Sequence, residues 1–231
     1  MKHRGLLKYC FSQTIPVMTG YIFMGMAFGI LLQSQGYNFL WAGLMGITVY
    51  AGSMQFVAVN LLTNAFAPLK TLLITLMVNA RHIFYGFSML ERFRDTGKLK
   101  PYLVFSLTDE TFSLLYSTPP PENASKPLFY FYISLLDQLY WILGCILGGL
   151  LGSQLSFNTQ GIEFVMTALF ASIFAEQFRA KHNRLPALIG LGGSAVCLAI
   201  FGPDHFILPA MVLMVALLTL GRKQVEGRSA Q

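Results

Sequence analysis

The sequence is poor in charged residues. Of its 231 residues, 11% are Asp, Glu, Lys or Arg, whereas 55% are hydrophobic, and the mean hydropathy is +0.57. A soluble domain usually carries about 25% charged residues, which cover the surface that faces water. Because this chain has too few charges for such a surface, much of its apolar matter must face lipid.

Several functional motifs are also absent. The sequence has no G-x-x-x-x-G-K-[ST] phosphate loop, no H-E-x-x-H helix and no Cys–His cluster. The three cysteines, Cys10, Cys145 and Cys197, lie in or beside apolar segments, so we read them as small hydrophobic residues. No aromatic and basic pattern predicts nucleic-acid binding. We therefore expect neither an enzyme nor a protein that needs a cofactor or a metal.

Long apolar segments are what the sequence has instead. Several of them exceed the ~20 residues that a helix needs to cross a bilayer. The strands of a membrane β-barrel would give weaker, ten-residue signals. The fold class predicted is therefore all-α, a polytopic membrane helix bundle of about seven hydrophobic segments. These lie at residues 15–33, 39–63, 68–90, 128–152, 162–178, 185–201 and 205–220.

Basic residues indicate which connections face the cytoplasm. They cluster in the N-terminal flank, in the 91–127 loop, at 179–184 and in the C-terminal tail. This distribution suits the second half, with two pairs of spans between cytoplasmic connections. In the first half, three apolar segments separate two basic regions that should share one side. An odd number of crossings cannot achieve this.

Two arrangements would resolve the conflict in the first half. One of its three segments is broken or re-entrant, and residues 50–56, YAGSMQF, are the preferred break. Otherwise residues 101–118 cross back. Non-helical backbone at membrane depth is tolerated only inside protein or beside a wet cavity. Either arrangement therefore predicts a polar interior site in the first half.

The chain divides at a proline-rich linker, STPPPENASKP. The predicted regions are a basic cytoplasmic flank at 1–14, a first membrane half at 15–116, the linker at 117–127, a second membrane half at 128–221 and a cytoplasmic tail at 222–231. Similarity between VYAGSMQF (49–56) and SIFAEQF (172–178) suggests an internal repeat. Small residues at helix-packing spacing are Gly25, Gly29, Gly144, Gly148 and Gly152.

The quartet Asn79-Ala80-Arg81-His82 interrupts the centre of an apolar segment, residues 71–90. An Arg at the bilayer centre costs at least ~2.5 kcal/mol, so Arg81 should face the interior and contact an anion. That anion is either an acidic side chain or a substrate carboxylate, which a guanidinium binds through two parallel hydrogen bonds. Asn79 and His82 share a helix face and could line the same cavity. In the alternative interpretation, an Arg–Asp pair only locks two helices together.

Few acidic residues lie in apolar surroundings. Asp109 and Glu110 begin a predicted helix that Thr108 caps, where they could also serve only as partners of the helix dipole. Asp137 interrupts an apolar segment and could pair with Arg81 or carry a proton. His82 could move protons near neutral pH. The substrate-binding candidates are Ser53, Gln55, Asn79 and Arg81. The candidates for proton coupling or charge pairing are His82, Asp109, Glu110 and Asp137.

Four polar motifs in order, GYIFMGMAFG, YAGSMQF, NARHIFYGFSM and TDETFSLL, resemble the AzlC family of branched-chain amino acid permeases. The later GIEFVMTALF is similar to that family's second half. Ala80 stands where the family usually has leucine, which leaves the polar residues in place. The resemblance implies a multi-span exporter with a small AzlD-type membrane partner. The positions that match the family's polar motifs are Gln55, Asn79, Arg81, His82, Asp109 and Glu110.

The resulting hypothesis is the large subunit of a secondary transporter that exports branched-chain amino acids across the bacterial inner membrane. Both termini are expected in the cytoplasm, and proton entry is expected to drive export. Arg81 would bind the substrate carboxylate, while Asp109 or Glu110 would receive the ammonium group or the proton. The alternatives are a passive channel for small solutes and an accessory subunit of a membrane complex.

Overall fold

The computed structural model describes residues 3–63, 65, 67–122, 124–154, 184–202 and 206–221, with scattered residues between 164 and 179. Throughout these residues the regular elements are helices, which confirms the all-α prediction. Two compact units divide the chain, Met1–Glu163 and Phe164–Gln231, and each is considered by itself. The repeat segment predicted at 172–178 falls largely outside the described residues, and the tail at 222–231 does so entirely.

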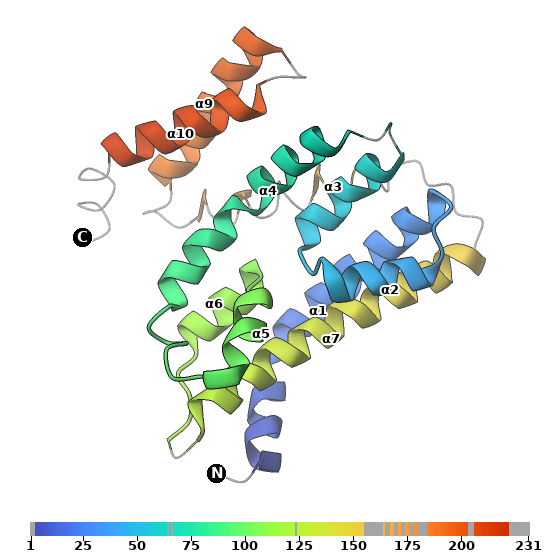
Figure 1. The fold of residues 1–231 in the computed structure, drawn as a ribbon, viewed down its shortest axis with the longest axis vertical. Coiled ribbons are helices and arrows are strands. Elements are labelled where there is room, and N and C mark those ends of the chain that lie inside the picture. Colours follow the sequence, from blue (N-terminus) through green and yellow to red (C-terminus); the bar gives the residue numbers. More distant parts are fainter. Residues whose placement is uncertain are drawn as a thin grey trace. The chain divides into compact units, whose positions relative to one another are not determined.

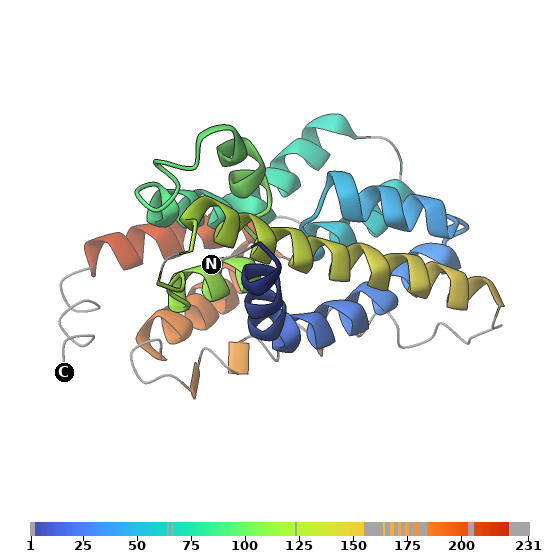
Figure 2. The same ribbon diagram turned by 90° about the horizontal axis from the view of Figure 1, so that it is seen from below.

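Two long helices, α1 (His3–Ser34) and α7 (Lys126–Gln154), lie side by side in the first unit (Figures 1 and 2). Both are long and apolar enough to cross a membrane. Glycines let their backbones touch, as predicted: a Cβ on Gly29 would meet the Cys145 carbonyl oxygen, and one on Gly148 would meet that of Met26. Such close approach is how small residues join membrane helices. This pair is the frame on which the shorter helices rest.

The second apolar segment is broken. Helix α2 (Phe39–Thr48) starts at Asn38, whose side chain accepts the first backbone N–H groups, and α3 (Gly52–Thr63) follows after three residues. Between them Tyr50 has φ of 40°, a left-handed conformation that is uncommon for a non-glycine residue. Figures 1 and 2 show that the chain reverses here, so that α3 returns toward the end of the unit where α2 began. The predicted break is confirmed, although it lies at 49–51, at the start of the predicted range.

A second reversal follows in residues 101–118. After a 3-10 turn, η1 (Gly97–Leu99), helix α5 (Lys100–Phe105) ends before Ser106, and α6 (Asp109–Ser117) turns back toward the end from which α5 came (Figure 1). The predicted cap is present, because the Thr108 side chain accepts the Thr111 backbone N–H. Residues 101–118 therefore form two short helices, and the alternative in which they cross back is wrong.

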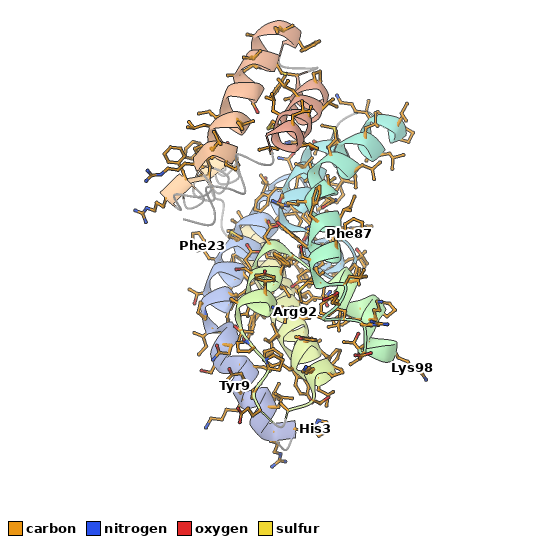
Figure 3. The ribbon with its side chains drawn as sticks, turned by 90° about the vertical axis from the view of Figure 1, so that its left-hand side faces the viewer. His3, Tyr9, Phe23, Phe87, Arg92 and Lys98 are labelled. Carbon is orange, nitrogen blue, oxygen red and sulfur yellow. The ribbon has the colours of Figure 1, made fainter. Side chains whose placement is uncertain are left out.

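Helix α4 (Pro68–Met89) joins the end of α3 to the basic loop at 91–99. His3 and Lys98 lie toward the same end of the first unit (Figure 3). Two long helices, α1 and α4, thus lie between the two basic regions, while α2 and α3 return to their own side. Among the described helices, α1, α7 and α9 are long and apolar enough to cross a membrane, and α4 is not one of them.

A buried apolar cluster fixes the end of the first unit that carries the basic loop. Its large, fully buried side chains come from α1, α4, the basic loop, α5, α6 and α7: Leu6, Met89, Phe93, Leu103, Leu115, Phe129 and Ile133. The Arg92 guanidinium donates to the carbonyl oxygens of Leu115 and Tyr116 and lies 4.9 Å from the Tyr116 ring centroid (Figure 3). These contacts hold the C-terminal end of α6. Because α6 is short, they also help to set the position of its first turn.

In the second unit, α9 (Arg184–Phe201) and α10 (Ile207–Leu220) pack against each other. Helix α9 is long and apolar enough to cross a membrane. Gly193 faces Met214 in this contact, and a Cβ there would lie 3.4 Å from Met214 Cγ, an ordinary van der Waals distance. The three cysteines are free and buried, as the sequence predicts.

Candidate functional site

An ion pair joins α3, α4 and α6. Nη1 of Arg81 on α4 lies 3.0 Å from Oδ2 of Asp109, and Nη2 donates to Oγ of Ser53. One helical turn further along α4, the Tyr85 hydroxyl donates to Asp109 Oδ1 at 2.6 Å. The Arg81 and Asp109 side chains are 33% and 29% exposed, so the pair is reachable. The sequence places these residues far apart, and the two reversals bring them together.

Both partners of the guanidinium stand where a short helix begins. Ser53 is in the first turn of α3, and Asp109 is the first residue of α6. The first N–H groups of a helix have no partner within it, and the helix dipole makes this end positive. A carboxylate at the start of α6 is therefore stabilised, and an anion beside Ser53 would be as well. The site can hold negative charge at two points around one cation.

Side-chain contacts fix the positions of the two breaks, at 49–51 and 106–108, relative to each other. The rings of Tyr50, in the first break, and Phe105, at the end of α5, have centroids 6.3 Å apart. The Tyr102 hydroxyl donates to Gln138 Oε1 at 2.8 Å, and Gln138 Nε2 donates to the Ile47 carbonyl oxygen at 3.4 Å. Gln138 of α7 is thus hydrogen-bonded both to the end of α2 and to the middle of α5, and it fixes these two helices relative to each other.

Several buried polar atoms on α3 and α4 have no hydrogen-bond partner. They include Arg81 Nε, Asn79 Oδ1 and Gln55 Nε2. Gln55 is fully buried, and its Oε1 accepts from Trp141 Nε1 at 2.7 Å. His82 packs against Tyr85, with ring centroids 5.7 Å apart. Since buried polar groups normally have partners, these free donors and acceptors indicate capacity to bind a ligand.

A second polar cluster lies between α1, α6 and α7. The Tyr21 hydroxyl oxygen is 2.9 Å from Glu110 Oε2 and 2.5 Å from Thr108 Oγ1. Thr108 Oγ1 is 3.0 Å from Thr111 Oγ1, which lies 2.8 Å from Asp137 Oδ2. Asp137 is 0% exposed, and its Oδ1 has no partner. We call Tyr21, Thr108 and Thr111 the hydroxyl chain.

The candidates from the sequence thus fall into two groups. Ser53, Arg81 and Asp109 contact one another directly, with Asn79 and His82 on the same helix as Arg81. Glu110 and Asp137 lie at the ends of the hydroxyl chain, and Gln55 is held by Trp141. The predicted option of an Arg81–Asp137 pair is not what forms, because Asp109 is the partner of Arg81.

Sequence reasoning missed the residues that connect these groups, namely Tyr21, Tyr85, Thr111 and Trp141. Tyr, Thr and Trp count as apolar or weakly polar in a hydrophobic segment, so they did not stand out. Only spacing carried a signal, because Tyr85 follows Arg81 by four residues and must share its helix face.

Comparison with known proteins agrees with the early motifs. The family described as AzlC protein matches residues 16–155, a range that contains both polar clusters. The chain is 47% identical over 216 residues to the branched-chain amino acid transport protein AzlC of Bacillus subtilis, covering 94% of this chain and 85% of that protein.

Two further relatives are membrane proteins whose function is uncharacterised. One, from Helicobacter pylori, is 48% identical over 219 residues, covering 95% of this chain and 96% of the relative. The other, from Haemophilus influenzae, is 41% identical over 222 residues, covering 96% and 91%. No solved structure matches the chain.

Proposed function

Because the chain belongs to the AzlC family, we propose that it carries branched-chain amino acids across the bacterial inner membrane. It acts as the large subunit of a proton-coupled exporter for valine, leucine, isoleucine and their analogues, with a small AzlD-type membrane partner. The Bacillus subtilis relative is named for branched-chain amino acid transport. The observation that carries the proposal is the Arg81–Asp109 pair, held in reach of a ligand between two helix starts.

The ion pair is a template for a zwitterion. The substrate carboxylate binds the Arg81 guanidinium beside Ser53, and the substrate ammonium group binds the Asp109 carboxylate. Each charge of the pair thereby exchanges one partner for another, and no ion is left unpaired in the membrane interior. This matters because an unpaired ion in a low dielectric costs several kcal/mol.

The unpartnered atoms around the pair add specificity for an α-amino acid. Arg81 Nε can donate to the second carboxylate oxygen, which completes a two-bond fork. Asn79 Oδ1 can accept a hydrogen bond from the ammonium group. An amine or a carboxylic acid lacks one of the two charges and would leave Arg81 or Asp109 without a partner. A peptide holds its two charges farther apart than an α-amino acid does, so the site favours free amino acids.

Apolar side chains next to the charges suit an aliphatic substrate. The Tyr85 and Phe112 rings are stacked, with centroids 4.5 Å apart, beside Asp109. Met54 directly follows Ser53 on α3. A branched side chain can pack against these flat and flexible surfaces, whereas a charged one would be desolvated without a partner.

Two features of the sequence support protons, and not ATP, as the energy source. No phosphate loop for ATP is present in the sequence, and membrane-embedded carboxyl groups are typical proton carriers. Export, with both termini in the cytoplasm, is the direction that the family resemblance implies. The small partner subunit would complete the transport unit.

Counterflow in vesicles tests this proposal. The chain is reconstituted with its partner subunit, and uptake of labelled leucine is followed with and without unlabelled leucine inside. We expect internal leucine to accelerate uptake and the rate to saturate. A linear flux that internal leucine does not change would identify a passive channel and overturn the proposal.

Direction is tested in cells loaded with a branched-chain dipeptide. Internal leucine should fall faster when the gene is present, and a protonophore should abolish that difference. Retained activity of the purified chain without further proteins would exclude a purely accessory role. Unchanged internal leucine would contradict export.

A further inference from the structure

Glu110 and Asp137 are connected by an unbroken series of oxygen atoms. The hydroxyl chain makes four contacts in this series: Glu110 to Tyr21 at 2.9 Å, Tyr21 to Thr108 at 2.5 Å, Thr108 to Thr111 at 3.0 Å and Thr111 to Asp137 at 2.8 Å. All four distances are within the range of O–H···O hydrogen bonds. A carboxyl group stands at each end.

The three hydroxyl groups supply one hydrogen fewer than the four O···O contacts need. Each O–H···O bond needs one hydrogen, and each hydroxyl supplies one. The hydroxyl chain has three hydroxyl hydrogens for four contacts. The backbone N–H of Thr111 donates to Thr108 and supplies none of the four. A proton on either carboxyl group supplies the fourth hydrogen and completes the series.

We propose that Glu110 and Asp137 share one exchangeable proton through the hydroxyl chain, and that this is the proton whose movement drives transport. The first part stands on the geometry alone. The second part rests on the proposed function, because it assigns the coupling proton of that transporter to residues outside the Arg81–Asp109 pair.

Proton transfer along the chain is balanced. Glu110 passes its proton to the Tyr21 oxygen, while each hydroxyl passes its own hydrogen to the next oxygen and the last one arrives on Asp137 Oδ2. Four O–H bonds break and four form, and one proton has moved from Glu110 to Asp137. The reverse shift restores the first arrangement, so the proton can move along the chain in either direction.

The surroundings differ at the two ends. Asp137 is 0% exposed, and its second oxygen has no partner. Within the described residues, no cation is among the titratable groups that interact with it, which are Tyr21 of α1, Tyr50 of the first break, Tyr102 of α5, Glu110 of α6 and Tyr140 of α7. A buried carboxylate without a cation is costly, so this end favours the bound proton.

The Glu110 end lies beside the ion pair. Glu110 follows Asp109 directly, is only partly buried, and interacts electrostatically with Asp109 of α6, Arg81 of α4 and Tyr21 of α1. A zwitterion that opens the Arg81–Asp109 pair changes the charges next to Glu110. The position of the shared proton is thereby linked to occupancy of the substrate site.

Interrupting the hydroxyl chain tests the transport part of the proposal. Tyr21→Phe and Thr111→Val each remove one hydroxyl, and Thr14→Val is the matched control. The Thr14 hydroxyl is buried on α1 and bonds to the Tyr140 hydroxyl at 3.0 Å, outside the hydroxyl chain. The readout is the ratio of leucine accumulation driven by a pH gradient to leucine counterflow.

We expect this ratio to fall about tenfold or more in Tyr21→Phe and Thr111→Val, as when a positioned proton-transfer group is removed. It should stay at the wild-type value in Thr14→Val. A ratio that the chain variants leave unchanged, or that the control lowers equally, would overturn the assignment. Absent counterflow in the wild type would instead overturn the proposed function.

Infrared spectroscopy tests the shared proton without any transport. The purified chain in lipid at pH 7 should show the C=O stretching band of a neutral carboxylic acid. The band should persist in Asp109→Asn and disappear in the double variant Glu110→Gln/Asp137→Asn. If the double variant is not recovered, Tyr21→Phe should shift the band, because the acid loses its partner. A wild type without the band, or a band unaltered by these changes, would refute the proton.

Discussion

Ser53 and Asp109 stand in the first turns of two short helices that approach from opposite ends of the unit, and both contact the guanidinium of Arg81. Neither residue lies on a helix long enough to cross a membrane. The only long helix of the three is α4, which presents Arg81 near its middle. The charge of Arg81 is thus held where two helix starts meet.

Charge neutralisation separates a transport role of the ion pair from a purely structural one. Arg81→Ala should lower leucine transport by about 10- to 100-fold, since hydrogen bonds to a charged group contribute ~1.5–3 kcal/mol. Arg81→Ala also leaves Asp109 without its cation, which can impair assembly. The double variant Arg81→Gln/Asp109→Asn removes both charges, so it should assemble normally but not transport leucine. The measurement is counterflow normalised to the amount of folded protein, with Lys98→Ala as a surface control.

A double variant that transports at the wild-type rate would show that the pair only locks α4 to α6. Arg81→Lys refines the result. Lys keeps the charge but lacks the planar fork, so we expect it to bind leucine more weakly than the wild type while assembling normally.

Cysteine labelling tests the reversal at Tyr50. In a background without the three native cysteines, single cysteines replace His3, Gly36, Ala67 or Lys98. An impermeant maleimide on intact cells should label positions 36 and 67 alike, and positions 3 and 98 alike, with the two pairs differing. Positions 36 and 67 on opposite sides would mean that α2 and α3 cross the membrane together.

Adding a methyl group to the glycines between α1 and α7 should destabilise the fold. Gly29→Ala places a Cβ against backbone atoms of Cys145 and Gly149, which cannot move aside as a flexible side chain would. Overpacking of this kind costs ~1–3 kcal/mol, which lowers the thermal unfolding midpoint by about 5 °C in a protein of this size. Gly20→Ala on the same helix has no heavy atom within 4 Å of the new Cβ and should leave the midpoint unchanged.

The two tryptophans provide an optical assay of binding. Trp41 is exposed, whereas Trp141 is buried and donates to Gln55, two residues after Ser53 on α3. In Trp41→Phe, leucine that engages Ser53 and Arg81 should change Trp141 emission in a saturable way. Gln55→Leu should remove the response while leaving the protein folded. An equal response to aspartate would contradict a site built for aliphatic amino acids.

Much of the fold could be predicted because scarcity of charge and the distribution of Lys and Arg constrain it strongly. The odd number of apolar segments in the first half required a break, and the break at 49–51 overlaps the start of the predicted range 50–56. Its position was less predictable. The segment YAGSMQF contains a glycine, Gly52, yet the positive φ belongs to Tyr50, whose buried ring lies 6.3 Å from that of Phe105.

The contacts within the site were only partly accessible from sequence. Arg81 in mid-segment required an anion, but Asp109, Glu110 and Asp137 all have apolar flanks, so spacing alone could not choose among them. The second reversal decides it by placing the start of α6 against α4. The hydroxyl chain left no trace in the hydropathy pattern, since its residues are individually common in membrane helices.

The glycine seam between α1 and α7 has a mechanical consequence. Where backbone rests on backbone, no side chain can change rotamer to accommodate sliding, so these two helices behave as one rigid strut. Helix α4 is the opposite case, because Met89 at its very end is its one buried residue among those described. We therefore expect a change of access within this unit to be a rocking of α2, α3 and α4 against the stationary pair of α1 and α7.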